Sequence, residues 1–201
     1  MLTIYDLKPS FQRLLRPVCD WLARHGITPN QLTVGTAVMS LAQGLWLTLA
    51  PGVRLPLLIL PLVLFVRMGL NAIDGMIAKE NGLQSRLGAL LNELGDAVSD
   101  TALYLPFALI PGVNPVLVVL LVITGILVEM TGVVTVQIGA SRRYDGPLGK
   151  SDRAFLFGCI ALMLGVGTKP GIWIDVVLTV GLLLSLYTIY NRACHGLKEN
   201  R

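Results

Sequence analysis

The chain has few charged residues, and this scarcity argues against a soluble domain. Of its 201 residues, 14% are charged and 54% are hydrophobic, and the mean hydropathy is +0.70. A soluble domain has about 25% charged residues. The composition therefore predicts an integral membrane protein, with most of its side chains facing lipid or packed between helices.

Cysteine and histidine are also scarce, which excludes two common kinds of site. The three cysteines, Cys19, Cys159 and Cys194, show no C-x-x-C spacing, so neither a disulfide framework nor a zinc site is expected. The two histidines, His25 and His195, are isolated, and we assign them no role. Because long linkers, low-complexity tracts and internal repeats are absent, we expect one domain over residues 1–201.

The first 30 residues lack an uninterrupted apolar core, so we expect no cleavable signal peptide there. Hydrophobic residues instead recur at helical spacing between basic ones, at Phe11, Leu14, Leu15, Val18, Trp21 and Leu22. This pattern predicts an amphipathic helix within residues 1–31. The helix either lies in the membrane interface or packs on the cytoplasmic face of the protein.

Six long apolar runs follow this segment and predict an all-α, six-helix membrane bundle over residues 32–191. A helix needs about 20 apolar residues to cross the hydrocarbon of a bilayer, and most of the runs approach that length. The runs are 32–50, 56–77, 88–111, 114–138, 153–168 and 171–191. Residues 192–201 are then expected to form a cytoplasmic tail.

Lysine and arginine are distributed unevenly among the connections, which predicts the orientation. Thirteen of the 16 basic residues lie in the N-terminal segment, the tail and the connections after the second and fourth runs. Arg54 and Lys169 lie on the opposite side, and Arg67 lies within a run. Because basic connections stay cytoplasmic, we expect a multi-pass protein of the cell (inner) membrane with both termini cytoplasmic. The net charge of +4 then reflects topology, and no nucleic-acid partner is expected.

Two of the apolar runs carry polar side chains at helical spacing. The first stripe consists of Arg67, Asn71, Asp74 and Ala78. The second repeats every four residues and consists of Gly88, Asn92, Asp96 and Asp100. Residues three and four apart share one helix face, and both stripes lie near the connection 79–87. We therefore expect the two polar faces to meet close to the cytoplasmic surface.

The chemistry of these stripes suits a divalent cation and a phosphate group. Charged side chains within a membrane are costly and are functional candidates by default. Carboxylate and amide oxygens are ligands for Mg²⁺ or Mn²⁺; Gly75 and Gly88 permit close approach, and Lys79 can hold a phosphate. Small and polar residues also stabilise the packing of membrane helices against one another. Their concentration within 30 residues nevertheless favours a ligand site with a cytoplasmic opening.

The same residues resemble the signature of the CDP-alcohol phosphotransferase family. That signature reads D-x-x-D-G-x-x-A-R, eight residues, then G-x-x-x-D-x-x-x-D. Every spacing is met, by Asn71, Asp74, Gly75, Ala78, Lys79, Gly88, Asn92 and Asp96. The segment 26–33, GITPNQLT, also looks like the family's approach to its first span.

The resemblance implies a transferase that displaces CMP from CDP-diacylglycerol or another CDP-alcohol, with the hydroxyl of a small polar alcohol as nucleophile. It also implies Mg²⁺ or Mn²⁺ and a homodimer in membrane lipid. The implied metal ligands are Asn71, Asp74, Asn92 and Asp96, with Asp96 also the catalytic base. The implied contacts to the CDP moiety are Asn30, Gln31, Leu32, Thr33, Gly75, Ala78, Lys79, Ser85 and Gly88.

The chain departs from the signature at three positions. Asn71 and Asn92 stand at two of the four acids, and Lys79 stands at the arginine. An amide oxygen can ligate a cation but brings no charge, so we expect weak metal binding before substrate arrives. These departures leave a second hypothesis open, a non-catalytic CDP-lipid-binding or partner protein. A transporter or channel ranks last, because the polar residues gather at one end.

Residues around the signature complete the expected site. We expect Arg67 to be a counter-ion to the acidic pocket, Glu93 to offer compensating charge, and Asp100 to act as an additional ligand or support. The alternative for Asp100 is an ion pair with Arg67. Lys150 and Arg153 are expected to bind the phosphate of a phosphorylated acceptor, unless their loop only sets topology or touches anionic lipid.

Overall fold

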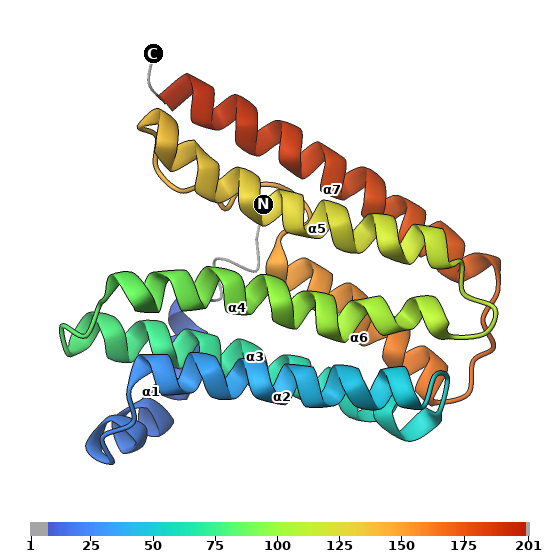
Figure 1. The fold of residues 1–201 in the computed structure, drawn as a ribbon, viewed down its shortest axis with the longest axis horizontal. Helices are drawn as coiled ribbons and strands as arrows, with labels where there is room; N and C mark the ends of the chain where they lie inside the picture. The colour runs from blue at the N-terminus through green and yellow to red at the C-terminus, as the bar shows by residue number, and fades with distance from the viewer. Residues whose placement is uncertain (1–7, 200–201) are drawn as a thin grey trace.

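The computed structural model describes residues 8–199, which fold into seven α-helices (Figure 1). The helices are α1 Lys8–Arg24, α2 Pro29–Leu49, α3 Arg54–Glu80, α4 Arg86–Tyr104, α5 Pro115–Val134, α6 Lys150–Gly165 and α7 Ile172–Glu199. Two short 3₁₀ segments, η2 Leu105–Leu109 and η3 Thr135–Ile138, extend α4 and α5. No strand occurs in this part of the chain, so the all-α expectation is confirmed.

The helices form two groups that meet along α4, α5 and α6. In Figure 1, α2, α3 and α4 run side by side, while α5 and α7 pair above them. Helix α6 packs on α3 behind this face. An aromatic cluster connects α6 with the end of α4 and with η2, because the ring of Phe157 on α6 stacks on Tyr104 and meets the edge of Phe107, with centroids 4.3 Å and 5.2 Å apart.

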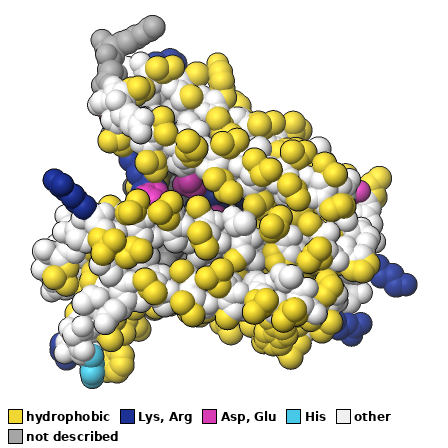
Figure 2. Space-filling model, viewed as in Figure 1, with side chains coloured by type: hydrophobic (Ala, Val, Ile, Leu, Met, Phe, Trp, Pro, Cys, Tyr) yellow, Lys and Arg dark blue, Asp and Glu magenta, His cyan; other side chains and the backbone are white. Residues whose placement is uncertain are grey.

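Four helices of this structure are long and apolar enough to cross a membrane: α2, α3, α5 with η3, and α7. Helix α4 carries several charged residues, and α6 has 16 residues. Hydrophobic side chains cover most of the face seen in Figure 2, and charged ones concentrate at the ends and in a central hollow. The protein is therefore a multi-pass membrane protein, while spans through α4 and α6 stay a prediction.

Helix α1 packs across the end of α3. Cys19 is buried against Ile73, Met76 and Ile77. Helix α2 begins at Pro29, three residues inside the expected N-terminal segment, because Thr28 caps it and Gln31 closes a reciprocal capping box.

The expected tail is helical in its described part, which corrects that boundary. Helix α7 continues to Glu199 because the connection 139–149 holds its last turns. Arg143 pairs with Glu199 at 3.0 Å, and the Asp145 carboxylate lies 2.7 Å from Nδ1 of His195. Residues 192–199 therefore belong to the folded bundle.

Candidate functional site

Asp74 lies where α2 and α3 meet. The hydroxyl of Thr33 on α2 donates a hydrogen bond to Asp74 Oδ2 at 2.9 Å. The Asp74 side chain belongs to the buried part of α3, with the residue 6% exposed. Helix α2 thus holds one acid of the signature in a fixed orientation.

The Asp96 carboxylate on α4 contacts polar side chains of three other residues. The Asn71 amide on α3 donates to Asp96 Oδ1 at 2.9 Å, and Arg67 approaches the same oxygen at 3.3 Å. Nζ of Lys150, at the start of α6, lies 2.5 Å from Asp96 Oδ2. The polar faces of α3 and α4 therefore meet, as their spacing predicts.

Gly88 makes room for the start of α2. A Cβ atom at Gly88 would lie 2.8 Å from Asn30 Oδ1 and 3.0 Å from Ser85 Oγ. Ser85 is the N-cap of α4 and accepts a hydrogen bond from the Gly88 amide at 2.9 Å. Asn92 lies half-buried one turn before Asp96 on the same helix. Residues from α2 and α4 therefore border one end of the cluster.

The remaining expected CDP contacts divide into open and packed positions. Gly75 is exposed, and a Cβ atom added there would meet no heavy atom within 4 Å among residues 8–199 outside the neighbouring backbone of its own helix. Ala78 is half-buried, and Lys79 is exposed. Gln31 is exposed, with its side chain in the capping box of α2. Leu32 packs against the cluster between α1 and α3. The face around Gly75 is accordingly open to a ligand.

A buried ion-pair network lies beside this open face. Arg67 NH1 lies 2.5 Å from Asp100 Oδ1, and Arg153 NH2 lies 3.1 Å from Asp100 Oδ2. Both arginines are 2% exposed, and Asp100 is 8% exposed. The Asp100 carboxylate thus pairs with two guanidinium groups. Its pair with Arg67 is the alternative that the sequence left open. Arg67 is a counter-ion to Asp96 and Asp100 in this geometry.

Sequence reasoning missed the acid that extends this network. Glu129 on α5 accepts from Arg153 at 3.1 Å and lies 3.4 Å from Arg192 on α7. Arg192 also donates to the backbone carbonyl of Val128 at 2.7 Å and to that of Asp145 at 3.0 Å. A signal was available, because Glu129 is the single acid in the apolar run 114–138.

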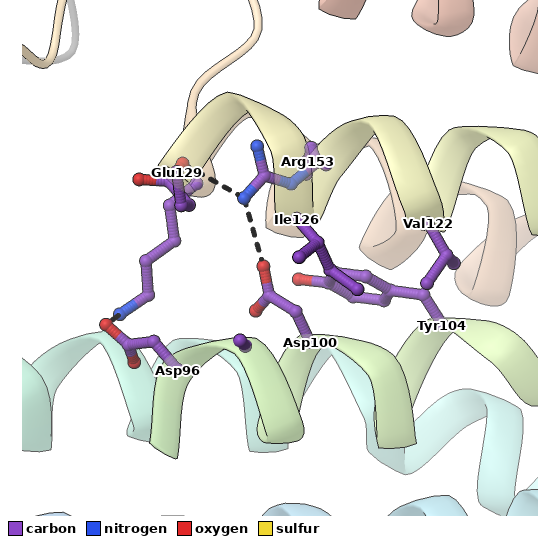
Figure 3. Close-up of a pocket in the computed structure, with 10 residues that line it drawn as sticks. Asp96, Asp100, Tyr104, Val122, Ile126, Glu129 and Arg153 are labelled. Atoms are coloured by element: carbon purple, nitrogen blue, oxygen red, sulfur yellow. Dashed lines mark hydrogen bonds and ion pairs between the residues drawn. The ribbon is translucent and has the colours of Figure 1, made fainter. Parts of the chain in front are cut away.

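A small cavity of about 20 Å³ lies between the two groups of helices. Figure 3 shows Asp96, Asp100 and Arg153 around it, with Tyr104 at one side. The Tyr104 hydroxyl is buried and has no hydrogen-bond partner among the described residues. The lining residues are Asp96, Ala97, Asp100, Tyr104, Val122, Gly125, Ile126, Glu129, Lys150 and Arg153.

The charged residues of the connection 139–149 pair with partners other than Asp96. Glu93 forms an ion pair with Arg142, whose guanidinium lies 4.7 Å from the centre of the Tyr144 ring. Burial acts to raise the pKa of Asp145, but hydrogen bonds from His195 and Arg143 outweigh it and hold the pKa below its ordinary value. These contacts fix the connection against α4 and α7.

The donor set around Asp74 and Asp96 fits a hard divalent cation. Within residues 8–199 no three histidine, cysteine or acidic side chains form a metal-binding group. The available donors are the carboxylates of Asp74 and Asp96 and the amides of Asn71 and Asn92, which are oxygen ligands. Two carboxylates and two amides would suit one such cation.

A family model described as CDP-alcohol phosphatidyltransferase matches residues 26–186. Over 191 residues the chain is 46% identical to the inner membrane protein YnbA of Escherichia coli, covering 95% of this chain and 94% of that protein. It is 28% identical over 176 residues to the archaetidylinositol phosphate synthase of Aeropyrum pernix, covering 82% and 87%.

Solved structures share the fold at low sequence identity. Phosphatidylinositol phosphate synthase (PgsA1) of Mycobacterium tuberculosis with CDP-DAG bound matches with a TM-score of 0.74 at 21% identity, covering 90% of this chain and 92% of that one. The same enzyme in complex with manganese and citrate matches with the same TM-score, covering 90% and 88%. The helical arrangement described above therefore also occurs in these solved structures.

Proposed function

The chain belongs to the CDP-alcohol phosphatidyltransferase family, and from that premise we propose that it transfers a phosphatidyl group from CDP-diacylglycerol to a small polar alcohol. It is a membrane transferase of phospholipid biosynthesis. One observation carries the proposal: the Asn71 amide and the Asp96 carboxylate, from two separate helices of the signature, are joined at 2.9 Å. The signature thus forms one polar cluster.

The donor's cytidine diphosphate would lie over the open face around Gly75. The exposed ammonium of Lys79 supplies positive charge there, and Asn30, Thr33 and Ser85 supply polar groups from the helix starts. Gln31 and Leu32 then act by shaping the start of α2, while Ala78 and Gly88 keep the surface shallow. A related structure that contains CDP-DAG supports a lipid-linked donor.

Asp74 and Asp96, with the amide oxygens of Asn71 and Asn92, would hold Mg²⁺ or Mn²⁺. The cation, when bound, neutralises charge that develops on the diphosphate. Asp74 and Asp96 contribute two negative charges, and the substrate diphosphate adds about two more at neutral pH. Cation and nucleotide are accordingly expected to bind more tightly together than either does alone.

Asp96 is proposed as the base. The acceptor's hydroxyl oxygen forms a bond to the lipid-linked phosphorus, the bond from that phosphorus to CMP breaks, and the hydroxyl proton passes to the Asp96 carboxylate. A base must lie within hydrogen-bond reach of the proton that it takes. Asn71 and Arg67 hold Asp96 in place from α3.

The acceptor's phosphate would bind at Lys150, beside Asp96, once the contact between these two side chains opens. The Lys150 ammonium is 30% exposed, so it can exchange its contact with Asp96 for a phosphate. Arg153 lines the same small cavity as Lys150 but remains anchored by Asp100 and Glu129. A phosphorylated polyol is the favoured acceptor, a proposal supported by the names of two relatives.

The remaining proposals concern topology and assembly. We place both termini and the catalytic cluster on the cytoplasmic side, with α4 and α6 completing six spans and α1 in the interface. Asp100 and Arg67 then form a neutralised pair within the bundle, which lowers the penalty for α4. Two copies are expected to associate, a point that light scattering of the purified protein can test.

The test is release of CMP by the purified full chain in lipid micelles with Mn²⁺. CDP-diacylglycerol is combined with inositol phosphate, glycerol phosphate or unphosphorylated alcohols. We expect CMP release that requires both the cation and an acceptor, and faster release with a phosphorylated acceptor. Absence of CMP release with every acceptor would contradict the catalytic proposal and favour CDP-lipid binding alone.

A further inference from the structure

A second cavity lies at the end of the bundle opposite the signature cluster. Its volume is about 390 Å³, and it is formed by the connections before α3, before α5 and before α7. Twenty residues of α3 separate Arg54 from Asp74, roughly 30 Å along a helix. That separation matches the roughly 30 Å hydrocarbon thickness of a bilayer, so the cavity lies at the outer surface if the signature lies at the inner one.

Both basic residues of this end line the cavity. Arg54 at the start of α3 and Lys169 in the connection before α7 are more than 100 residues apart along the chain, yet they border the same space. Basic residues are depleted in short connections on the outer side of a membrane. Arg54 and Lys169, the two exceptions to that rule in this chain, therefore lie at the same cavity. No acidic side chain lines the cavity with them.

The backbone around the cavity is shaped to accommodate these cations. Gly167 has a φ of +103°, and a Cβ atom there would lie 3.0 Å from a terminal guanidinium nitrogen of Arg54. Among residues 8–199 neither Arg54 nor Lys169 forms an ion pair with an acid. Prolines stiffen the wall, and Leu57 and Leu164 give it an apolar floor.

We propose that this cavity binds the phosphate of an anionic phospholipid of the outer leaflet. Arg54 and Lys169 would contact the phosphate oxygens, and the apolar floor would contact the first carbons of the lipid. A free phosphate ion shares the charge but not the apolar part. The proposal is independent of the transferase activity, because it concerns the opposite end of the bundle.

Trp173 offers a local probe of this site. Its indole donates a hydrogen bond to the Lys169 carbonyl oxygen at 3.1 Å. With Trp21→Phe and Trp46→Phe in the background, Trp173 is the sole tryptophan of the chain. Quenching by brominated phosphatidylglycerol or brominated phosphatidylcholine in detergent micelles then reports lipid at the cavity.

We expect phosphatidylglycerol to quench at a lower mole fraction than phosphatidylcholine. Arg54→Gln and Lys169→Gln should each weaken the preference about five-fold, since a cation near a lipid surface contributes about 1 kcal/mol. Arg54→Lys should retain the preference for phosphatidylglycerol. The control Lys198→Gln, at the opposite end of the bundle, should retain it too. The proposal would be overturned by equal quenching by both lipids, or by an unchanged preference when Arg54→Gln and Lys169→Gln are combined. Competition by an equal concentration of inorganic phosphate would overturn it as well. CMP release by Arg54→Gln should match that of the parent protein.

Discussion

Two neighbouring halves of the polar interior differ in how completely their charges are paired. The open half contains Asp74, Asn92 and the face around Gly75, where few protein groups bind the donor oxygens. The braced half contains Arg67, Asp100, Arg153, Glu129 and Arg192, where buried charges pair with one another. Asp96 belongs to both halves. The difference separates groups available to a ligand from groups that hold the helices together.

The largest expected effect is on catalysis, at the residue where the halves meet. Asp96→Ala should lower CMP release at least about 100-fold, because it removes the proposed base and a cation ligand. Glu80→Gln is a matched control, since it changes an exposed acid of α3 that pairs with Arg16. Equal turnover by Asp96→Ala and the parent protein would remove Asp96 from the mechanism.

In the braced half the main expected effect is on stability. Arg153→Met removes a cation that Asp100 and Glu129 share. Each acid keeps one arginine, but the buried network is left with excess negative charge, which costs about 3–5 kcal/mol. Arg142→Met should cost less than about 1 kcal/mol, because its pair with Glu93 is partly exposed. Unfolding in mixed micelles of denaturing detergent measures both. Similar losses in the two variants would show that the buried network does not brace the bundle.

The meeting of the two polar stripes and the Arg67–Asp100 pair could be predicted from the sequence, whereas the partners of Glu129 in the braced half could not. The stripes in α3 and α4 follow helical periodicity, so local spacing was enough to place Asn71 and Asp96 on facing surfaces. The partners of Glu129 come from α6 and α7. No local pattern encodes contacts between residues so far apart along the chain, and only the isolated acid in an apolar run gave a warning.

Boundaries were harder to predict for a related reason. The end of α7 depends on contacts of Arg192 and His195 with the connection around Asp145. Composition alone made residues 192–201 resemble a polar tail. Nearer the N-terminus of the chain, the capping box of Thr28 and Gln31 set the start of α2, and its residues were visible in the sequence.

Two glycines of the signature allow a finer comparison of ligand contact with packing. Gly75→Ala should keep the protein's stability, since nothing lies within 4 Å of the added Cβ, while KM for the CDP-alcohol rises about tenfold. Gly88→Ala should lower both stability and affinity, because its Cβ would meet Asn30 and Ser85. Melting temperature and KM, measured together, check the pair. A Gly75→Ala enzyme with unchanged KM would place the nucleotide elsewhere.

A smaller effect is expected from the unpaired hydroxyl in the cavity. Tyr104→Phe removes a buried hydroxyl that has no hydrogen-bond partner within residues 8–199, so stability should be unchanged or higher. If the hydroxyl binds the acceptor, KM for the acceptor rises roughly two- to tenfold, the range for one net hydrogen bond, while KM for the CDP-alcohol stays constant. A change confined to the CDP-alcohol would contradict this assignment.

The most direct measurement is calorimetric titration of the full chain with Mn²⁺, in the presence and absence of CDP. The account predicts tighter Mn²⁺ binding when CDP is present, because the diphosphate supplies charge that Asn71 and Asn92 lack, and loss of that coupling in Asp74→Ala. Mn²⁺ binding that is absent under both conditions, or that is unaffected by CDP and by Asp74→Ala, would contradict it.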